Sequence, residues 1–131
     1  MNILFVYFDK IIQNDNLYVK SLCEEIRRQN GSVECSIDAF WNSPRKYDIV
    51  HIQFPEVIFK WRPPSDNGLK ALRQRIARLK SMGTKIVYPR HDAIPHYCTD
   101  KNKLELYRIV ETQSNAIIHL GEYSRQEFAR I

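Results

Sequence analysis

Short apolar segments alternate with amphipathic ones along the whole chain. Residues 2–8 form an unbroken run rich in aromatic and branched side chains, which is typical of a strand buried on both faces of a parallel sheet. Residues 33–37 alternate apolar with polar side chains, so a strand is expected there too, near an edge of the sheet. Further strands are predicted at 47–54, 84–88 and 116–120.

Helices are predicted between these strands. One apolar stripe runs through 17–30, and a second begins at Leu69 with spacings of three, four and three and ends at Met82–Gly83. Shorter helical patterns cover 104–113 and begin again at 124–130. The remaining segments are predicted to be a connector and a long loop, at 39–46 and 55–67 respectively.

The order of these elements indicates the α/β class. Regular alternation of strand and helix is typical of a Rossmann-like doubly wound parallel sheet, here of about five strands, with helices on both faces. The 131 residues, of which 44% are hydrophobic, suit a single domain spanning 1–131.

The cysteines and the apolar segments bear on the cellular compartment. Three cysteines, without a Cys-x-x-Cys spacing, argue against a disulfide framework and against a zinc site, and Cys23 and Cys35 are predicted to fill the core. The first apolar run is too short for a membrane span and lacks the features of a signal peptide. A cytoplasmic location is therefore expected, with peripheral attachment to the inner face of the membrane as a refinement.

Positive charge is concentrated in one part of the sequence. The formal net charge is +5, and no acidic residue occurs between Asp66 and Asp92. The cations of the helix predicted from Leu69 have two interpretations. They could form an ordinary solvated face, or they could contact an anionic membrane with the help of the aromatic residues Trp41, Phe59 and Trp61. Because aromatic residues do not interleave with the cations, no nucleic-acid partner is expected. The cations on this helix are Lys70, Arg73, Arg75, Arg78 and Lys80.

Candidate ligand-binding residues follow the predicted strands. In doubly wound sheets, ligands bind outside the carboxyl ends of the strands. A dense polar cluster stands at 90–96, where histidine, arginine and aspartate could bind a ligand or merely cap a loop. A buried structural role is favoured for His119, and a loop role somewhat favoured for His51 and Glu56. The candidate residues are Asp9, Lys10, His51, Glu56, Arg90, His91, Asp92, His96, Glu122, Tyr123 and Ser124.

Several of these motifs, in this order, resemble one family. A Tyr-Asp-Ile-Val-His strand lies at 47–51, a strand at 85–87 is followed by His91-Asp92 and then Pro95, and Gly121-Glu122-Tyr123-Ser124 precedes a predicted helix. The chain resembles, over nearly all of its length, the N-terminal halves of retaining, GT-B-fold nucleotide-sugar glycosyltransferases of family 4. One departure is that no glycine precedes Gly31, although the family usually carries a glycine-rich loop after its first strand.

The resemblance implies a function and a set of roles. The histidine that matches His91 contacts the transferred sugar in that family, so His91 is the expected catalytic residue, and neighbouring polar residues are expected to bind substrate. The implied reaction transfers a sugar from a nucleotide-sugar donor to a saccharide or lipid-linked acceptor, with neither a metal nor another cofactor. The donor would bind mainly to a C-terminal domain outside this chain, so this half alone is expected to be inactive.

Two other functions remain open for a chain of this pattern. A phosphoacceptor receiver domain has the same alternation of elements, but it requires an aspartate at the end of the third strand, where this chain has Phe54-Pro55. The other alternative is a binding module without enzymatic activity that uses the positively charged helix.

Overall fold

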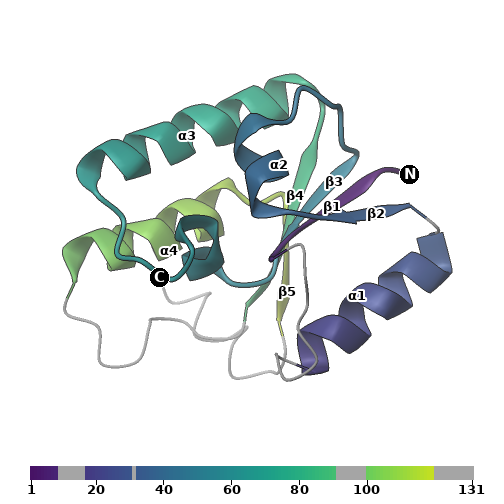
Figure 1. Ribbon diagram of the computed structural model, residues 1–131. Helices are drawn as coiled ribbons and strands as arrows, with labels where there is room; N and C mark the ends of the chain where they lie inside the picture. Colours follow the sequence, from purple (N-terminus) through teal and green to yellow (C-terminus); the bar gives the residue numbers. More distant parts are fainter. Residues whose placement is uncertain (9–16, 31, 91–99, 120–131) are drawn as a thin grey trace.

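Five parallel strands form one sheet in the order β2-β1-β3-β4-β5 (Figure 1). This computed structural model describes residues 1–8, 17–30, 32–90 and 100–119. The sheet confirms the predicted Rossmann-like α/β class, and the outer position of β2 confirms its predicted place at an edge. The strands are β1 (Ile3–Val6), β2 (Val33–Cys35), β3 (Ile49–Ile52), β4 (Lys85–Arg90) and β5 (Ala116–His119).

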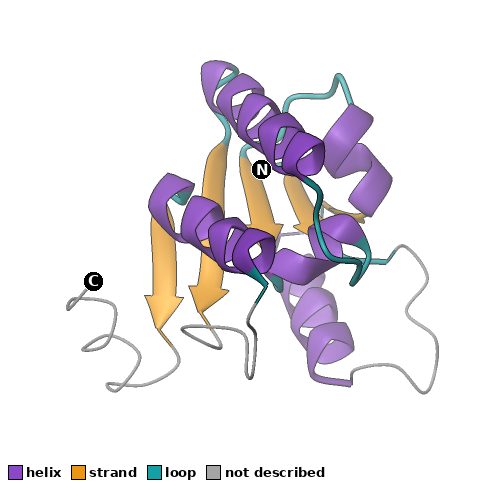
Figure 2. Cartoon of the chain, turned by 90° about the vertical axis from the view of Figure 1, so that its left-hand side faces the viewer, coloured by secondary structure: helices purple, strands orange, loops and turns teal. Residues whose placement is uncertain are grey.

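Helices cover both faces of the sheet. Helices α3 (Asp66–Ser81) and α4 (Lys101–Gln113) lie side by side on one face, in front of the strands in Figure 2. Helix α1 (Leu17–Asn30) lies on the other face, against β1 and β2 (Figure 1). None of the described helices is long and apolar enough to span a membrane.

The alternation of side chains along β1 explains the two halves of the core. Leu4 and Val6 belong to the cluster under α3 and α4, whereas Phe5 and Tyr7 belong to the cluster under α1. All four side chains are almost completely buried. A strand in this position needs apolar residues on both faces, which is why residues 3–8 form an unbroken apolar run.

Two helices begin earlier than the hydrophobic pattern predicts, because polar residues cap them. Helix α3 begins at Asp66, and the Ser65 hydroxyl accepts a hydrogen bond from the Gly68 backbone N–H at 3.0 Å. Helix α4 begins at Lys101, and the Asp100 carboxylate accepts from two backbone N–H groups of the first turn. Such caps satisfy N–H groups that have no partner within the helix.

Two elements were not expected from the sequence. A short helix, α2 (Ile37–Asn42), replaces the end of the predicted strand at 33–37 and part of the connector, and the Ser36 hydroxyl caps it. A 3₁₀ helix, η1 (Pro55–Phe59), lies within the predicted long loop. Both are too short to show a helical period, and tertiary contacts stabilise them by burying Phe40 of α2 and Val57 of η1.

Strand β4 is longer than predicted. The expected strand ended at Tyr88, yet β4 continues to Arg90 through Pro89, which has no backbone N–H. Pairing with β3 reaches only Val87, while pairing with β5 continues through Arg90 and His119, so the strand passes the proline while paired on one side. Arg90 therefore lies within the sheet and not in the loop that follows it.

Candidate functional site

A small pocket lies where the strands on the β2 side of the sheet end. It has a volume of about 200 Å³ and is lined by residues that follow β1, β2 and β3 along the chain. Ligands of parallel α/β sheets bind at this edge, near the point where the strand order reverses, which here is between β1 and β3. The lining residues are Phe8, Ser36, Ile37, Asp38 and Lys60.

A strained turn forms one side of this pocket. Lys60 and Trp61, which follow η1, have backbone φ angles of 55° and 66°, in the left-handed region that residues other than glycine seldom adopt. Hydrogen bonds from their N–H groups to Val57 and Glu56 carbonyls, at 2.9 and 3.0 Å, hold the turn. Each residue other than glycine in the left-handed region destabilises the folded state by about 1 kcal/mol or more. Such residues often occur at ligand-binding sites.

The turn presents the Trp61 indole to solvent. Trp61 is 52% exposed and packs against the ring of Phe54, with ring centroids 5.9 Å apart. The other two aromatic residues expected at the surface, Trp41 and Phe59, instead pack on the core, and the Trp41 indole N–H donates to the Ile58 carbonyl. Of the three aromatic residues considered for surface contact, Trp61 alone is therefore largely exposed.

His51 occupies a buried position in the middle of the sheet. Its ring stacks on Phe5 with centroids 4.5 Å apart and planes 13° from parallel, and its Nε2 atom lies 2.7 Å from Oε1 of Gln53. With 7% of its surface exposed, the side chain packs on Phe5 of the cluster under α1, one residue before β3 ends. These contacts favour a structural role for His51 over contact with an acceptor.

Arg90 is also turned into the protein. Its side chain is 1% exposed, and its Nε atom donates to the Glu111 carboxylate on α4 at 3.0 Å. Alternation along β4 places Arg90 on the same face as the core residues Ile86 and Tyr88. Arg90 therefore forms a buried ion pair, because extension of β4 carries this residue under α4, and its role in ligand binding stays a prediction.

Glu56 lies near the carboxyl ends of the strands and forms a hydrogen bond with a neighbouring helix. Its carboxylate accepts a hydrogen bond from the Tyr107 hydroxyl of α4 at 2.8 Å, so it joins η1 to α4. The side chain remains half-buried and close to the strand ends. The other predicted site residues lie outside the described residues: Asp9, Lys10, His91, Asp92, His96, Glu122, Tyr123 and Ser124.

His119 differs from its predicted place in the core. It ends β5, which is an edge strand of the sheet formed by the described residues, and it is half-buried. Ile118 beside it is 48% exposed.

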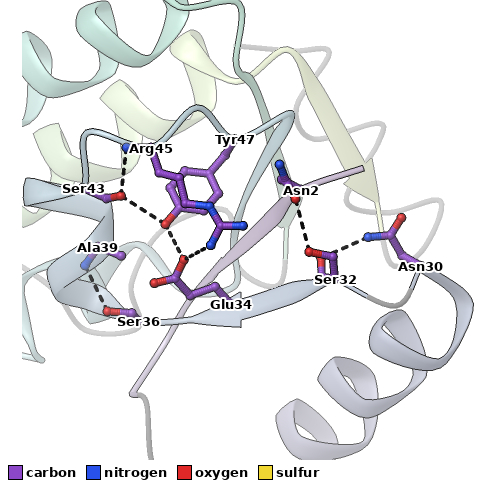
Figure 3. Close-up of polar contacts among 9 residues, drawn as sticks. All are labelled: Asn2, Asn30, Ser32, Glu34, Ser36, Ala39, Ser43, Arg45 and Tyr47. Carbon is purple, nitrogen blue, oxygen red and sulfur yellow. Dashed lines mark hydrogen bonds and ion pairs between the residues drawn. The ribbon is translucent and has the colours of Figure 1, made fainter.

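A polar network occupies the outer side of β2. Figure 3 shows the Tyr47 hydroxyl and the Arg45 guanidinium both directed at the Glu34 carboxylate of β2. Burial of Tyr47 and its hydrogen bond to Glu34 raise the pKa of this phenol. A polar hollow of about 230 Å³ lies beside the network, but its lining includes Asn2 and Ser32, which precede β1 and β2. This hollow is therefore away from the edge at which α/β folds bind ligands.

The cations of α3 are less available than the sequence suggests. Arg75 donates to the Phe40 and Ser43 carbonyls at the end of α2, and burial, followed by the charge of Arg78, lowers its pKa. Arg73 forms an ion pair with Glu105 of α4 at 2.6 Å. A hydrogen bond from Arg108, with Arg73 adding to it, holds the pKa of Glu105 below its usual value.

We expect Arg75→Ala to lower the free energy of unfolding by about 1.5–3 kcal/mol, the usual contribution of hydrogen bonds to a charged group. The loss arises because the α2 carbonyls lose the donors that join them to α3. Chemical denaturation followed by circular dichroism measures the change. Arg78→Ala, one turn away on the exposed face, is the matched control and should leave the unfolding midpoint nearly unchanged. Equal effects of both substitutions would refute the structural role of Arg75.

No metal site is evident in the part of the chain that the structure describes: no three histidine, cysteine or acidic side chains there converge on one point. No protein-family model matches the chain, and no curated protein matches it.

Proposed function

We propose that this chain is the acceptor-binding half of a retaining glycosyltransferase that takes its sugar from a nucleotide-sugar donor. The observation that carries the proposal is the strained turn that exposes Trp61 beside the pocket lined by Asp38 and Lys60. The parallel sheet and the resemblance of the motifs at 47–51 and 91–95 to family 4 glycosyltransferases support it.

The chemistry of this surface suits a saccharide. An exposed indole can stack on the apolar C–H face of a sugar ring, while a carboxylate and an ammonium group can hydrogen-bond its hydroxyls. The pocket volume of about 200 Å³ lies below the roughly 300–1,000 Å³ of sites that enclose a drug-sized ligand. The described surface is therefore sized to hold part of a sugar chain, such as the end of a saccharide or lipid-linked acceptor.

The transfer step would involve residues of both halves of the enzyme. The donor nucleotide would bind mainly to a second domain, and His91, by its resemblance to the family histidine, would contact the transferred sugar. Fixed dipoles and cations would stabilise the departing nucleotide diphosphate, because charge develops there in the transition state. In this proposal the reaction uses no metal, and the chain alone binds acceptor without turning it over.

The cellular location belongs to the same proposal. The enzyme would work in the cytoplasm or at the inner face of the membrane, where lipid-linked acceptors are anchored. Lys70 and Arg78 of α3 are exposed and could approach anionic lipid, whereas Arg75 is held against α2. Membrane contact through α3 would thus depend on fewer cations than the sequence offers.

Trp61→Ala should weaken saccharide binding about tenfold, which corresponds to loss of one aromatic contact. Labelled protein is first screened on an array of immobilised oligosaccharides, and the best-bound soluble oligosaccharide is then titrated by calorimetry. Arg62→Ala, on the same exposed segment, is the control and should bind as wild type does. Absence of any bound oligosaccharide, or equal affinity of Trp61→Ala and wild type, would count against the proposal.

One observation favours a receiver-like signalling module instead. The strand order β2-β1-β3-β4-β5 is also that of receiver domains. A receiver, however, needs an aspartate where β3 ends, and this chain has Gln53 after Ile52, completely buried beside His51. Incubation with acetyl phosphate separates the two functions, since a receiver would acquire an acid-labile phosphoryl group and an acceptor-binding domain would not.

A further inference from the structure

Two cysteines meet between α1 and β2. Cys23 lies in the middle of α1 and is 2% exposed, and Cys35 ends β2 and is half-buried. Both belong to the cluster that joins α1 to the sheet, and their thiols are close enough to form a hydrogen bond. The sequence predicts only that both fill the core, because their spacing matches no known cysteine motif.

The surroundings of the pair differ for the two thiols. The Cys35 thiol donates to the Phe8 carbonyl at 3.3 Å, and Nη2 of Arg27 lies 3.9 Å from the Cys23 sulfur. The hydrogen bond with Cys35 lowers the pKa of Cys23 to about 7, and the charge of Arg27 acts in the same direction. The charge of Arg27 favours the Cys23 thiolate even after Cys35 has reacted, and the thiolate is the form that attacks a disulfide.

We propose that Cys23 and Cys35 are a redox modification site that closes to an intramolecular disulfide on reaction with a low-molecular-weight disulfide such as oxidised glutathione. The half-buried Cys35 reacts first: its thiolate attacks one glutathione sulfur, and the other glutathione leaves as a thiolate. The Cys23 thiolate then attacks the Cys35 sulfur and expels the second glutathione thiolate. The two protein thiols are oxidised by two electrons, and one glutathione disulfide is reduced to two glutathiones.

Formation of the disulfide would change the contacts of residues that line the candidate pocket. Once Cys35 is oxidised, it has no S–H to donate to the Phe8 carbonyl, and Phe8 lines the pocket. Ser36 and Ile37, which also line it, follow Cys35 directly. This consequence does not depend on what the pocket binds.

The test is a titration of the chain in buffers of reduced and oxidised glutathione, followed by acid quenching, alkylation and mass spectrometry. In a Cys98→Ser background, two alkylatable thiols should disappear together, leaving a protein lighter by the two thiol hydrogens. In wild type, tryptic cleavage at Lys20, Arg27, Arg28 and Arg45 puts the two cysteines in separate peptides, so the linkage can be read even if the variant folds poorly.

Removing the second thiol provides the matched control. Cys23→Ser in the same background should accumulate a glutathione adduct on Cys35, because no internal thiolate can expel the glutathione. The proposal is overturned if the protein with both thiols accumulates the same adduct, or if it keeps two free thiols in all buffers. It also fails if the wild-type peptides show Cys98 in place of either partner.

Discussion

Glu111→Ala should lower the free energy of unfolding by about 3–5 kcal/mol, the usual effect of breaking a buried ion pair. The substitution removes the carboxylate that neutralises the Arg90 guanidinium, whose side chain is 1% exposed between β4 and α4. Water cannot replace that carboxylate without opening the contact between the helix and the sheet. Denaturant unfolding, followed by circular dichroism and by tryptophan fluorescence, measures the loss.

Two controls separate this effect from a general sensitivity of the surface. Arg73→Ala breaks an exposed ion pair with Glu105 and should change stability by no more than about 1 kcal/mol. The double variant Arg90→Met with Glu111→Leu should recover most of the loss, because it removes both buried charges and keeps the volume filled. A loss below about 1 kcal/mol for Glu111→Ala alone would mean that Arg90 is neutralised mainly by other groups.

In an enzyme that joins this chain to a donor-binding half, His91→Ala should reduce turnover by about a hundredfold or more, the usual contribution of a side chain engaged with the reacting group. His91 lies outside the described residues, so this prediction follows from the resemblance and from its place after β4. Initial rates of transfer from a radiolabelled nucleotide sugar measure turnover and KM separately.

The matched control is His119→Ala, which changes a half-buried histidine on the edge strand β5. It should leave turnover within a few fold of wild type, provided that thermal unfolding shows both variants to be folded. Unchanged turnover in His91→Ala would remove this residue from the site. A rise in KM with constant turnover would instead assign His91 to substrate binding.

The sheet could be predicted from sequence because buried parallel strands have an unmistakable composition. Every expected strand is present, and the unbroken apolar run at 3–8 is explained by the two core clusters on either side of β1. Elements without a period could not be predicted in the same way. Helix α2 and the 3₁₀ helix η1 are stabilised by contacts with the rest of the core, which no local pattern records.

The candidate site was predicted less well, for two physical reasons. Arg90 was expected to follow the strand that ended at Tyr88, and its partner Glu111 is 21 residues away on α4. Alternation with Ile86 and Tyr88 was the one signal that could have placed Arg90 in the core. The turn at Lys60–Trp61 gave no signal, because left-handed backbone is usually marked by glycine or asparagine.

The brevity of β2 bears on whether this edge of the sheet could pair with a strand of another chain. An outer strand offers hydrogen-bonding groups that a second chain could pair with, and long flat outer strands therefore promote fibrils. Here β2 has only 3 residues, and the ionic contact between Glu34 and Arg45 places charge along its rim. Intermolecular strand addition at this rim is thus disfavoured by both length and charge, so substitutions that neutralise Glu34 would be expected to make the protein more prone to aggregate.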